Sequence, residues 1–153
     1  MNVIRLGPED STLLAETLQR LKSPPGMRSP SAGHLDRFLS RPENILLVAL
    51  RDGVPEGFLV AYLLDRADRD QRMVCLYEIG VAEGSRRQGI GRALIETLKD
   101  LCKEQDAMKA WVITNRANRA AVSLFESSGA AADTEGDSIV FVYGPHTYER
   151  SGT

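Results

Sequence analysis

The sequence has few of the features that mark secreted, membrane-spanning or disulfide-stabilised proteins. It contains only two cysteines, Cys75 and Cys102, each within an apolar pattern. We therefore expect two core thiols rather than a disulfide framework, in a reducing, cytoplasmic setting. The longest apolar runs, 45–50 and 58–64, are far too short to span a bilayer, and the N-terminal residues lack the apolar stretch of a secretory signal. We expect no membrane partner.

An excess of positive charge is also lacking. The chain has 153 residues, with 19 Lys and Arg against 21 Asp and Glu, a net charge of −2. A dedicated nucleic-acid binder is usually strongly basic, so we expect no nucleic-acid partner. Hydrophobic residues make up 42% and charged residues 26%, which is typical of a globular protein. No repeat or linker divides the sequence, and we predict a single domain over residues 1–153.

Alternating and helical periodicities predict an α/β (α+β) domain. Strands are expected at 3–6, 45–50, 57–64, 73–81, 111–114 and 139–143. Helices are expected to begin near Pro8, just before Leu35, near Gly89 and at Asn118. The helix near Gly89 has the strongest pattern, because its apolar residues recur on one face. The prediction is a mixed central sheet of about seven strands with four helices, in the order β-α-α-β-β-β-α-β-α-β-β.

The most informative segment leads from a predicted central strand into the longest helix. Gly89 and Gly91 allow backbone N–H groups to approach a ligand at the start of that helix, where unpaired N–H groups and the helix dipole favour an anion. Positive side chains surround this point: Arg86, Arg87 and Arg92. The P-loop pattern is absent, and Leu94 stands where the dinucleotide fingerprint requires glycine or alanine. The segment predicts a phosphate site of another kind.

The pattern R-x-x-G-x-G, formed by Arg86, Gly89 and Gly91, resembles the acyl-CoA loop of the GCN5-related N-acetyltransferases (GNAT). The resemblance extends from the IGV strand before the loop to N-x-x-A at Asn118 and the LF-x-x-x-G string that ends at Gly129. The predicted order of elements is also similar to that of the family. Within the family, the chain is most similar to the short aminoglycoside 3-N-acetyltransferases, through its RLGP opening and its Y-E-x-x-V-x-x-x-x-RRQGI string.

This resemblance implies direct transfer of an acetyl group from acetyl-CoA to a primary amine. The implied acceptor is a small molecule, an aminoglycoside acetylated at its 3-amino group, and the implied assembly is a homodimer. The backbone that would pair with the pantetheine arm belongs to Ile79, Gly80 and Val81. The amides that would hold the pyrophosphate belong to Arg87, Gln88, Gly89, Ile90 and Gly91, with Arg86 and Arg92 nearby. The Asn118 side chain would reach the pantetheine or the acyl region.

A base is needed because an aliphatic amine is mostly protonated at neutral pH. Glu78 is the candidate. Strand alternation predicts that Val74, Leu76, Glu78 and Gly80 share one face, so that burial in an apolar row would raise the pKa of this carboxyl. The alternatives are that Glu78 binds a cationic substrate, or that it pairs with an arginine.

The acid that protonates the departing thiolate is the second catalytic group to find. In many relatives a tyrosine stands seven residues after the capping asparagine, whereas this chain has Phe125. Tyr143 is the candidate substitute, and the alternatives are a water as the acid and a core or dimer-interface role for Tyr143. No metal site is expected, because His34 and His146 lie far apart in the sequence.

Two other functions stay open at this point. The same chemistry could serve a different amine, such as a polyamine, a metabolite or a protein N-terminus. The chain could instead be a CoA-binding module with little catalysis, a reading that Phe125 in place of tyrosine favours.

Overall fold

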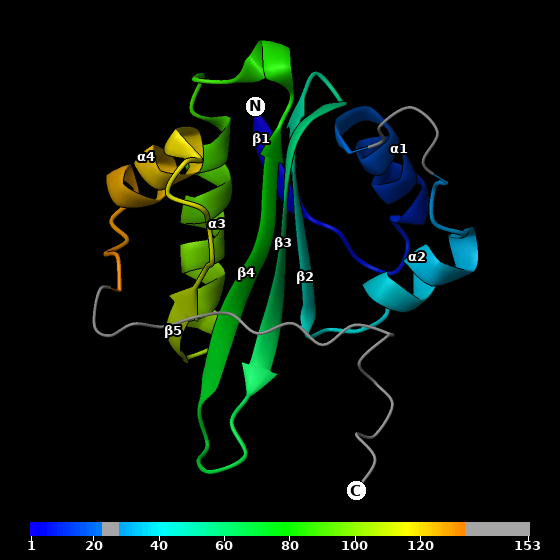
Figure 1. Ribbon diagram of the computed structural model, residues 1–153. Coiled ribbons are helices and arrows are strands. Elements are labelled where there is room, and N and C mark those ends of the chain that lie inside the picture. Colours follow the sequence, from blue (N-terminus) through cyan, green and yellow to red (C-terminus); the bar gives the residue numbers. More distant parts are fainter. Residues whose placement is uncertain (23–27, 134–153) are drawn as a thin grey trace, which may run out of the picture.

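The computed structural model describes residues 1–22 and 28–133, which form a five-stranded mixed sheet with helices on both faces (Figure 1). The strands lie side by side in chain order: β1 Asn2–Arg5, β2 Asn44–Arg51, β3 Val54–Asp65, β4 Arg72–Val81 and β5 Ala107–Trp111. Neighbouring strands are antiparallel from β1 to β4, and β5 runs parallel to β4. Four α-helices lie within the described residues: α1 Ser11–Leu21, α2 Ala32–Leu39, α3 Ile90–Glu104 and α4 Arg119–Ser127. The α/β prediction is confirmed, while the strand predicted at 139–143 falls outside the described residues.

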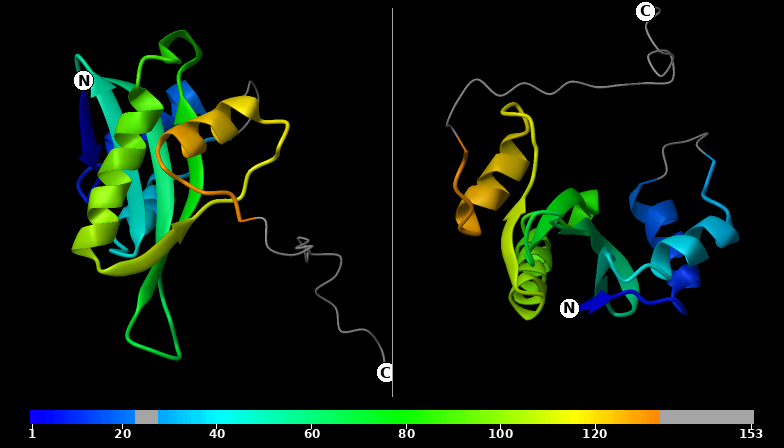
Figure 2. Two further views of the ribbon diagram at one scale, coloured as in Figure 1. Left: turned by 90° about the vertical axis from the view of Figure 1, so that its left-hand side faces the viewer. Right: turned by 90° about the horizontal axis from the view of Figure 1, so that it is seen from below.

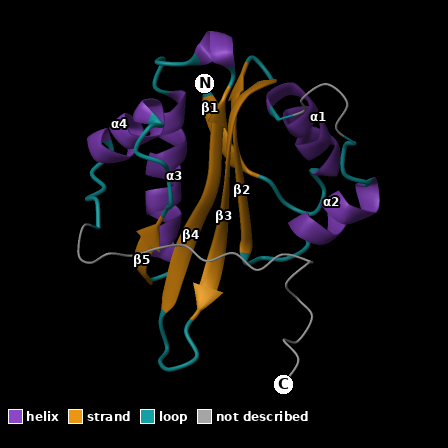
Figure 3. Cartoon of the chain, viewed as in Figure 1, coloured by secondary structure: helices purple, strands orange, loops and turns teal. Residues whose placement is uncertain are grey.

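Two apolar cores lie on opposite faces of the sheet, because successive side chains of a strand point to opposite faces. On one face, Leu94 of α3 and Phe125 of α4 pack with Leu59 of β3. On the other face, Leu14 of α1 and Leu35 of α2 pack with residues of β2 and β3. Figures 2 and 3 show the two helical layers with the sheet between them.

Strand β4 contains a bulge in the stretch that leads to the predicted phosphate loop. Its antiparallel register with β3 pairs Leu76 with Ala61 and Glu78 with Val60, so Tyr77 is an extra residue on β4. A bulge of this kind bends the strand and leaves one residue unpaired. Tyr77 is 67% exposed.

Because of this bulge, the candidate base Glu78 lies on the opposite face of the sheet from the one predicted. Val74 and Leu76 lie in the core beneath α3, as alternation requires. Gly80 instead faces the other core, since a Cβ added there would lie 2.5 Å from the Phe58 ring. The prediction that Val74, Leu76, Glu78 and Gly80 share one face is wrong, because an extra residue reverses the alternation that follows it. Glu78 faces the α1 and α2 side of the sheet.

The strand predicted at 111–114 is also misplaced, because β5 spans Ala107–Trp111. Its parallel pairing with β4 extends only from Arg72 to Cys75, so the last half of β4 continues beyond its partner. Parallel register depends on a strand far away in sequence, and local alternation does not reveal it.

Two predicted helix starts are confirmed. Gly89 precedes the first residue of α3, and Asn118 caps α4 by accepting a hydrogen bond from the N–H of Ala121 at 3.2 Å. Gly129 follows α4 with a φ of 96°, a left-handed conformation that is common for a glycine after a helix. The helix expected from Pro8 begins three residues later, at Ser11.

Within residues 1–22 and 28–133, no helix is long and apolar enough to cross a membrane. In the same residues, no group of three or more His, Cys, Asp or Glu side chains is arranged to hold a metal ion. Cys75 and Cys102 are both free thiols, and burial raises the pKa of each.

Candidate active site

The loop between β4 and α3 presents backbone N–H groups at the start of a helix. Arg87 and Gly89 adopt left-handed conformations, with φ values of 58° and 82°. Turns of this kind bring successive N–H groups to one side and form a concavity that binds anions. The first hydrogen bond of α3 runs from the N–H of Ala93 to the carbonyl of Gly89 at 3.0 Å. Within the described chain, the N–H groups of residues 90–92 have no acceptor, and a phosphate could provide one.

Positive charge surrounds this helix start. The side chains that provide it are exposed: Arg86, Arg87 and Arg92. Among the ion pairs of residues 1–22 and 28–133, none includes these three guanidinium groups. No atom lies within 4 Å of a Cβ added at Gly89, so the space in front of the loop is open. These features fit a phosphate group of a nucleotide-like ligand.

Glu56 of β3 holds the 3-10 turn η1 (Glu83–Ser85) that precedes the phosphate loop. Its carboxylate accepts a hydrogen bond from the Ser85 hydroxyl at 2.6 Å and pairs with Arg20 of α1 at 2.9 Å, while its backbone carbonyl accepts from the N–H of Ala82 at 2.8 Å. The hydrogen bond from Ser85, together with the charge of Arg20, holds the pKa of Glu56 below its ordinary value despite desolvation. The turn is thereby fixed to both β3 and α1.

Gln88 braces the loop from the other side. Its side-chain carbonyl accepts a hydrogen bond from Arg51 at 2.8 Å, and its amide donates to the carbonyl of Gly84 at 3.2 Å. The side chain therefore ties the loop to the end of β2 and to the 3-10 turn.

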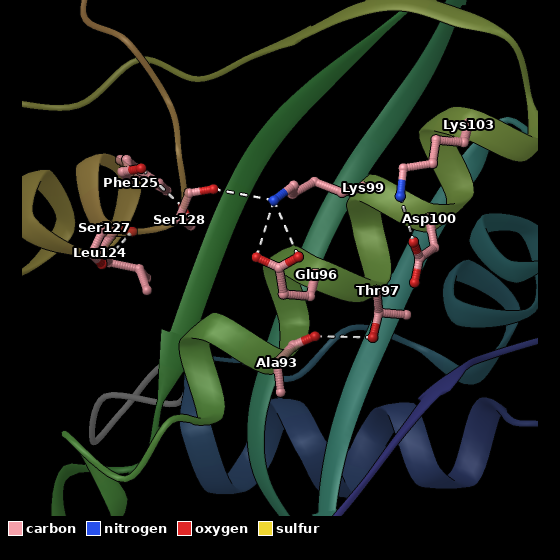
Figure 4. A network of polar contacts seen from close by, with 10 residues as sticks. All are labelled: Ala93, Glu96, Thr97, Lys99, Asp100, Lys103, Leu124, Phe125, Ser127 and Ser128. Atoms are coloured by element: carbon pink, nitrogen blue, oxygen red, sulfur yellow. Dashed lines mark hydrogen bonds and ion pairs between the residues drawn. The ribbon is translucent and has the colours of Figure 1, made fainter.

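Helix α4 packs on the first turn of α3, and this contact requires a glycine. A Cβ added at Gly91 would lie 3.0 Å from a methyl group of Leu124, so Gly91 allows the two helices to approach. The Lys99 ammonium of α3 donates to the carbonyl of Ser128 at 3.2 Å, which ties down the other end of α4 (Figure 4). Asn118 stands at the N-terminus of this tethered helix.

The end of β4 next to the loop has an open edge. Ile79, Gly80 and Val81 pair with β3 on one side, whereas β5 ends its pairing at Cys75 on the other. In the described part of the chain, no strand occupies the edge beyond Cys75. The backbone groups along such an edge can pair with an added extended segment.

Glu78, at this end of β4, forms an ion pair instead of lying in an apolar row. The ammonium of Lys22, at the end of α1, lies 2.7 Å from Oε2 of Glu78, with side-chain exposures of 48% and 29%. The Tyr62 and Tyr77 rings lie beside this pair and pack edge to face at 5.6 Å. Burial raises the pKa of Tyr62, and the neighbouring Tyr77, Cys75 and Glu78 add to this effect.

Sequence reasoning missed Lys22 and Tyr62 as neighbours of Glu78. Tyr62 stands in an apolar run that reads as core, and Lys22 begins a loop, so neither carries a signal of its own. Phe125 is buried in the core beneath α3 and has no polar atom to serve as an acid. Tyr143, the candidate acid, lies outside the described residues.

Comparison with known proteins gives a family match over most of the chain. The model of the acetyltransferase (GNAT) family matches residues 12–130. The ribosomal protein bS18 alanine N-acetyltransferase of Escherichia coli K12 is 33% identical over 73 residues. That match covers 48% of this chain and 48% of the relative, so it spans about half the length of each.

Two solved structures extend the likeness to nearly the whole chain. An aminoglycoside acetyltransferase from an uncultured soil metagenomic sample, solved with trehalose, has a TM-score of 0.85 at 20% identity and covers 94% of this chain and 95% of its own. Another aminoglycoside acetyltransferase from an uncultured soil metagenomic sample has a TM-score of 0.74 at 29% identity and covers 92% and 98%. The first likeness shows the fold alone, and the second adds sequence similarity. From the family match over residues 12–130, the chain belongs to the GNAT family of acetyltransferases.

Proposed function

We propose that this protein is an N-acetyltransferase that transfers the acetyl group of acetyl-CoA to the 3-amino group of an aminoglycoside. The observation that carries the proposal is the ion pair of Glu78 beside the open edge of β4. Its carboxylate binds a primary ammonium, that of Lys22, at 2.7 Å. Family membership supports acetyl-CoA as the co-substrate. The 29% identical aminoglycoside acetyltransferase supports the acceptor class.

In this proposal the phosphate loop and the edge of β4 bind the co-substrate. The N–H groups of residues 87–91 bind the pyrophosphate, and Arg86 and Arg92 add positive charge. The backbone of Ile79, Gly80 and Val81 pairs with the pantetheine arm as an added strand would, and Asn118 contacts that arm from the start of α4. Acetyl-CoA supplies the activated acyl group, a thioester.

Glu78 acts as the base in this proposal. Its carboxylate removes a proton from the acceptor ammonium, directly or through a water, and leaves a neutral amine that can attack the thioester. Burial raises the pKa of the Cys75 thiol and so disfavours the thiolate, which supports direct transfer without a cysteine intermediate. Phe125 offers no proton for the thiolate, so that proton comes from water or from Tyr143.

Thiol release from acetyl-CoA tests the acceptor class. Sisomicin, kanamycin, spermidine and a peptide that begins with alanine form the panel of amines, and the NMR spectrum of the product identifies the acetylated position. We expect thiol release with the aminoglycosides and acetylation of their 3-amino group. Turnover with spermidine alone would refute the acceptor class while retaining the family chemistry.

Glu78→Gln tests the base. We expect kcat to fall by about 10²- to 10⁴-fold, the usual contribution of a general base, while the affinity for CoA stays unchanged. Glu104→Gln is the control, because Glu104 is an exposed carboxylate at the far end of α3. An unchanged kcat in Glu78→Gln would contradict this role.

A peptide amine is the second candidate acceptor. The alanine N-acetyltransferase of E. coli, which is 33% identical over 73 residues, favours it. Turnover with the alanine peptide and none with aminoglycosides would identify this function. CoA binding without turnover on any amine would instead indicate a binding module.

A further inference from the structure

Lys22 places an amine of the protein itself at the candidate base. Lys22 is the C-cap residue of α1, and its backbone N–H donates to the carbonyl of Leu18 at 2.9 Å. The helix therefore fixes the backbone from which the side chain extends. The ammonium lies 2.7 Å from Oε2 of Glu78, a hydrogen-bonding distance.

The side chain of Lys22 carries the same functional group as the proposed acceptor. A base must lie within hydrogen-bonding reach of the proton it removes, and the Lys22 ammonium meets this condition at Glu78. A tethered amine also reacts at a high effective concentration. Exposed ion pairs are weak, so Lys22 exchanges readily between paired and free positions.

We propose that Lys22 is a self-acetylation site, modified at Nζ from acetyl-CoA when no acceptor is bound. The inference rests on the proposed function, because it takes Glu78 as the base. Glu78 removes a proton from the Lys22 ammonium, and the Nζ lone pair attacks the thioester carbonyl. A C–N bond forms, the C–S bond breaks, the thiolate of CoA leaves, and the second Nζ proton passes to solvent. The product is a neutral amide that no longer forms an ion pair with Glu78.

Two other lysines serve as internal controls for chemical acetylation. Lys99 pairs with Glu96 at 3.1 Å and Lys103 pairs with Asp100 at 3.0 Å, both on α3 (Figure 4). These lysines also have carboxylate partners but lie away from Glu78. Faster acetylation of Lys22 than of these two lysines would therefore result from its position at Glu78, and not merely from having a carboxylate partner.

The experiment incubates the full chain with acetyl-CoA in the absence of acceptor and follows acetylation by mass spectrometry. Trypsin does not cut after an acetylated lysine, so modification yields an uncut peptide of residues 21–28. We expect Lys22 to be acetylated at least about tenfold faster than Lys99 and Lys103. Glu78→Gln should reduce the rate at Lys22 to that of the two controls, and Lys22→Arg should remove the signal. Equal rates at all three lysines in the wild type would overturn the proposal.

A second measurement needs no acetyl-CoA. The NMR signal of the Lys22 side chain should shift in Glu78→Gln, while those of Lys99 and Lys103 stay in place. An unshifted Lys22 signal would mean that the pair does not form, and it would also overturn the proposal. Turnover on the amine panel distinguishes self-acetylation of Lys22 from the proposed aminoglycoside acceptor. Turnover with aminoglycosides while Lys22 stays unmodified refutes self-acetylation alone. Lys22 acetylation without turnover on the panel refutes the acceptor class alone.

Discussion

Glu56 links three parts of the candidate site, so its replacement gives a demanding test of how the phosphate loop is held. The carboxylate is 13% exposed and joins Arg20 of α1 to Ser85 of the 3-10 turn. Glu56→Gln keeps the shape of the side chain and removes its charge. Arg20 keeps a neutral acceptor, whereas the Ser85 hydroxyl loses a charged one.

The expected loss of stability follows from these two contacts. Hydrogen bonds to a charged group contribute about 1.5–3 kcal/mol, and Arg20 is 46% exposed, so solvent screening reduces the total to about 1–2 kcal/mol. For a chain of this length, that change corresponds to a fall in Tm of about 2–8 °C. The looser turn should also weaken CoA binding, measured by calorimetry, more than it changes kcat. Asp68→Asn, in an exposed ion pair with Arg66, is the control and should leave the Tm unchanged.

The lowered pKa of Glu56 determines how its contribution to the free energy of unfolding changes with pH. Because the folded pKa of Glu56 is lowered from its ordinary value of 4.5, its contribution to stability is fully present above that pH. It is lost as the pH falls from 4.5 through the folded pKa. The difference in unfolding free energy between wild type and Glu56→Gln should therefore be constant near neutral pH and shrink in acid. A difference that persists unchanged at about pH 3 would refute the reasoning.

Two further substitutions probe the loop and the start of α4. Gly89→Val should abolish CoA binding in calorimetry, because a branched side chain strains the left-handed backbone at a φ of 82° and fills the open space before the N–H groups. Gly84→Ala is the control and should bind CoA normally, since a Cβ added at Gly84 meets no atom within 4 Å. Asn118→Ala removes the cap of α4 and should lower stability by about 0.5–2 kcal/mol in denaturant unfolding. Asn118→Ser retains a side chain that can cap the helix, so it should keep normal stability. If Asn118 also contacts the ligand, Asn118→Ser should bind CoA more weakly. Normal CoA binding in Asn118→Ser would contradict the ligand role.

Local signals in the sequence predicted the parts of the fold that depend on neighbouring residues. The start of α3 after Gly89 and the cap at Asn118 both follow from residue types within a few positions. The errors concern pairing between distant segments. Nothing in the β4 sequence identifies Tyr77 as the extra residue, because the bulge exists only in the register with β3.

The bulge at Tyr77 is the step that joins the two halves of the candidate site. Without it, alternation would keep Glu78 in the core face with Leu76, away from α1. With it, Glu78 turns toward the end of α1, where Lys22 meets it, while the same helix end supplies Arg20 to Glu56 beneath the phosphate loop. The last turn of α1 thus contacts both the candidate base and the support of the loop. Changes that shift α1 on the sheet should therefore alter the KM for the acceptor and for acetyl-CoA together.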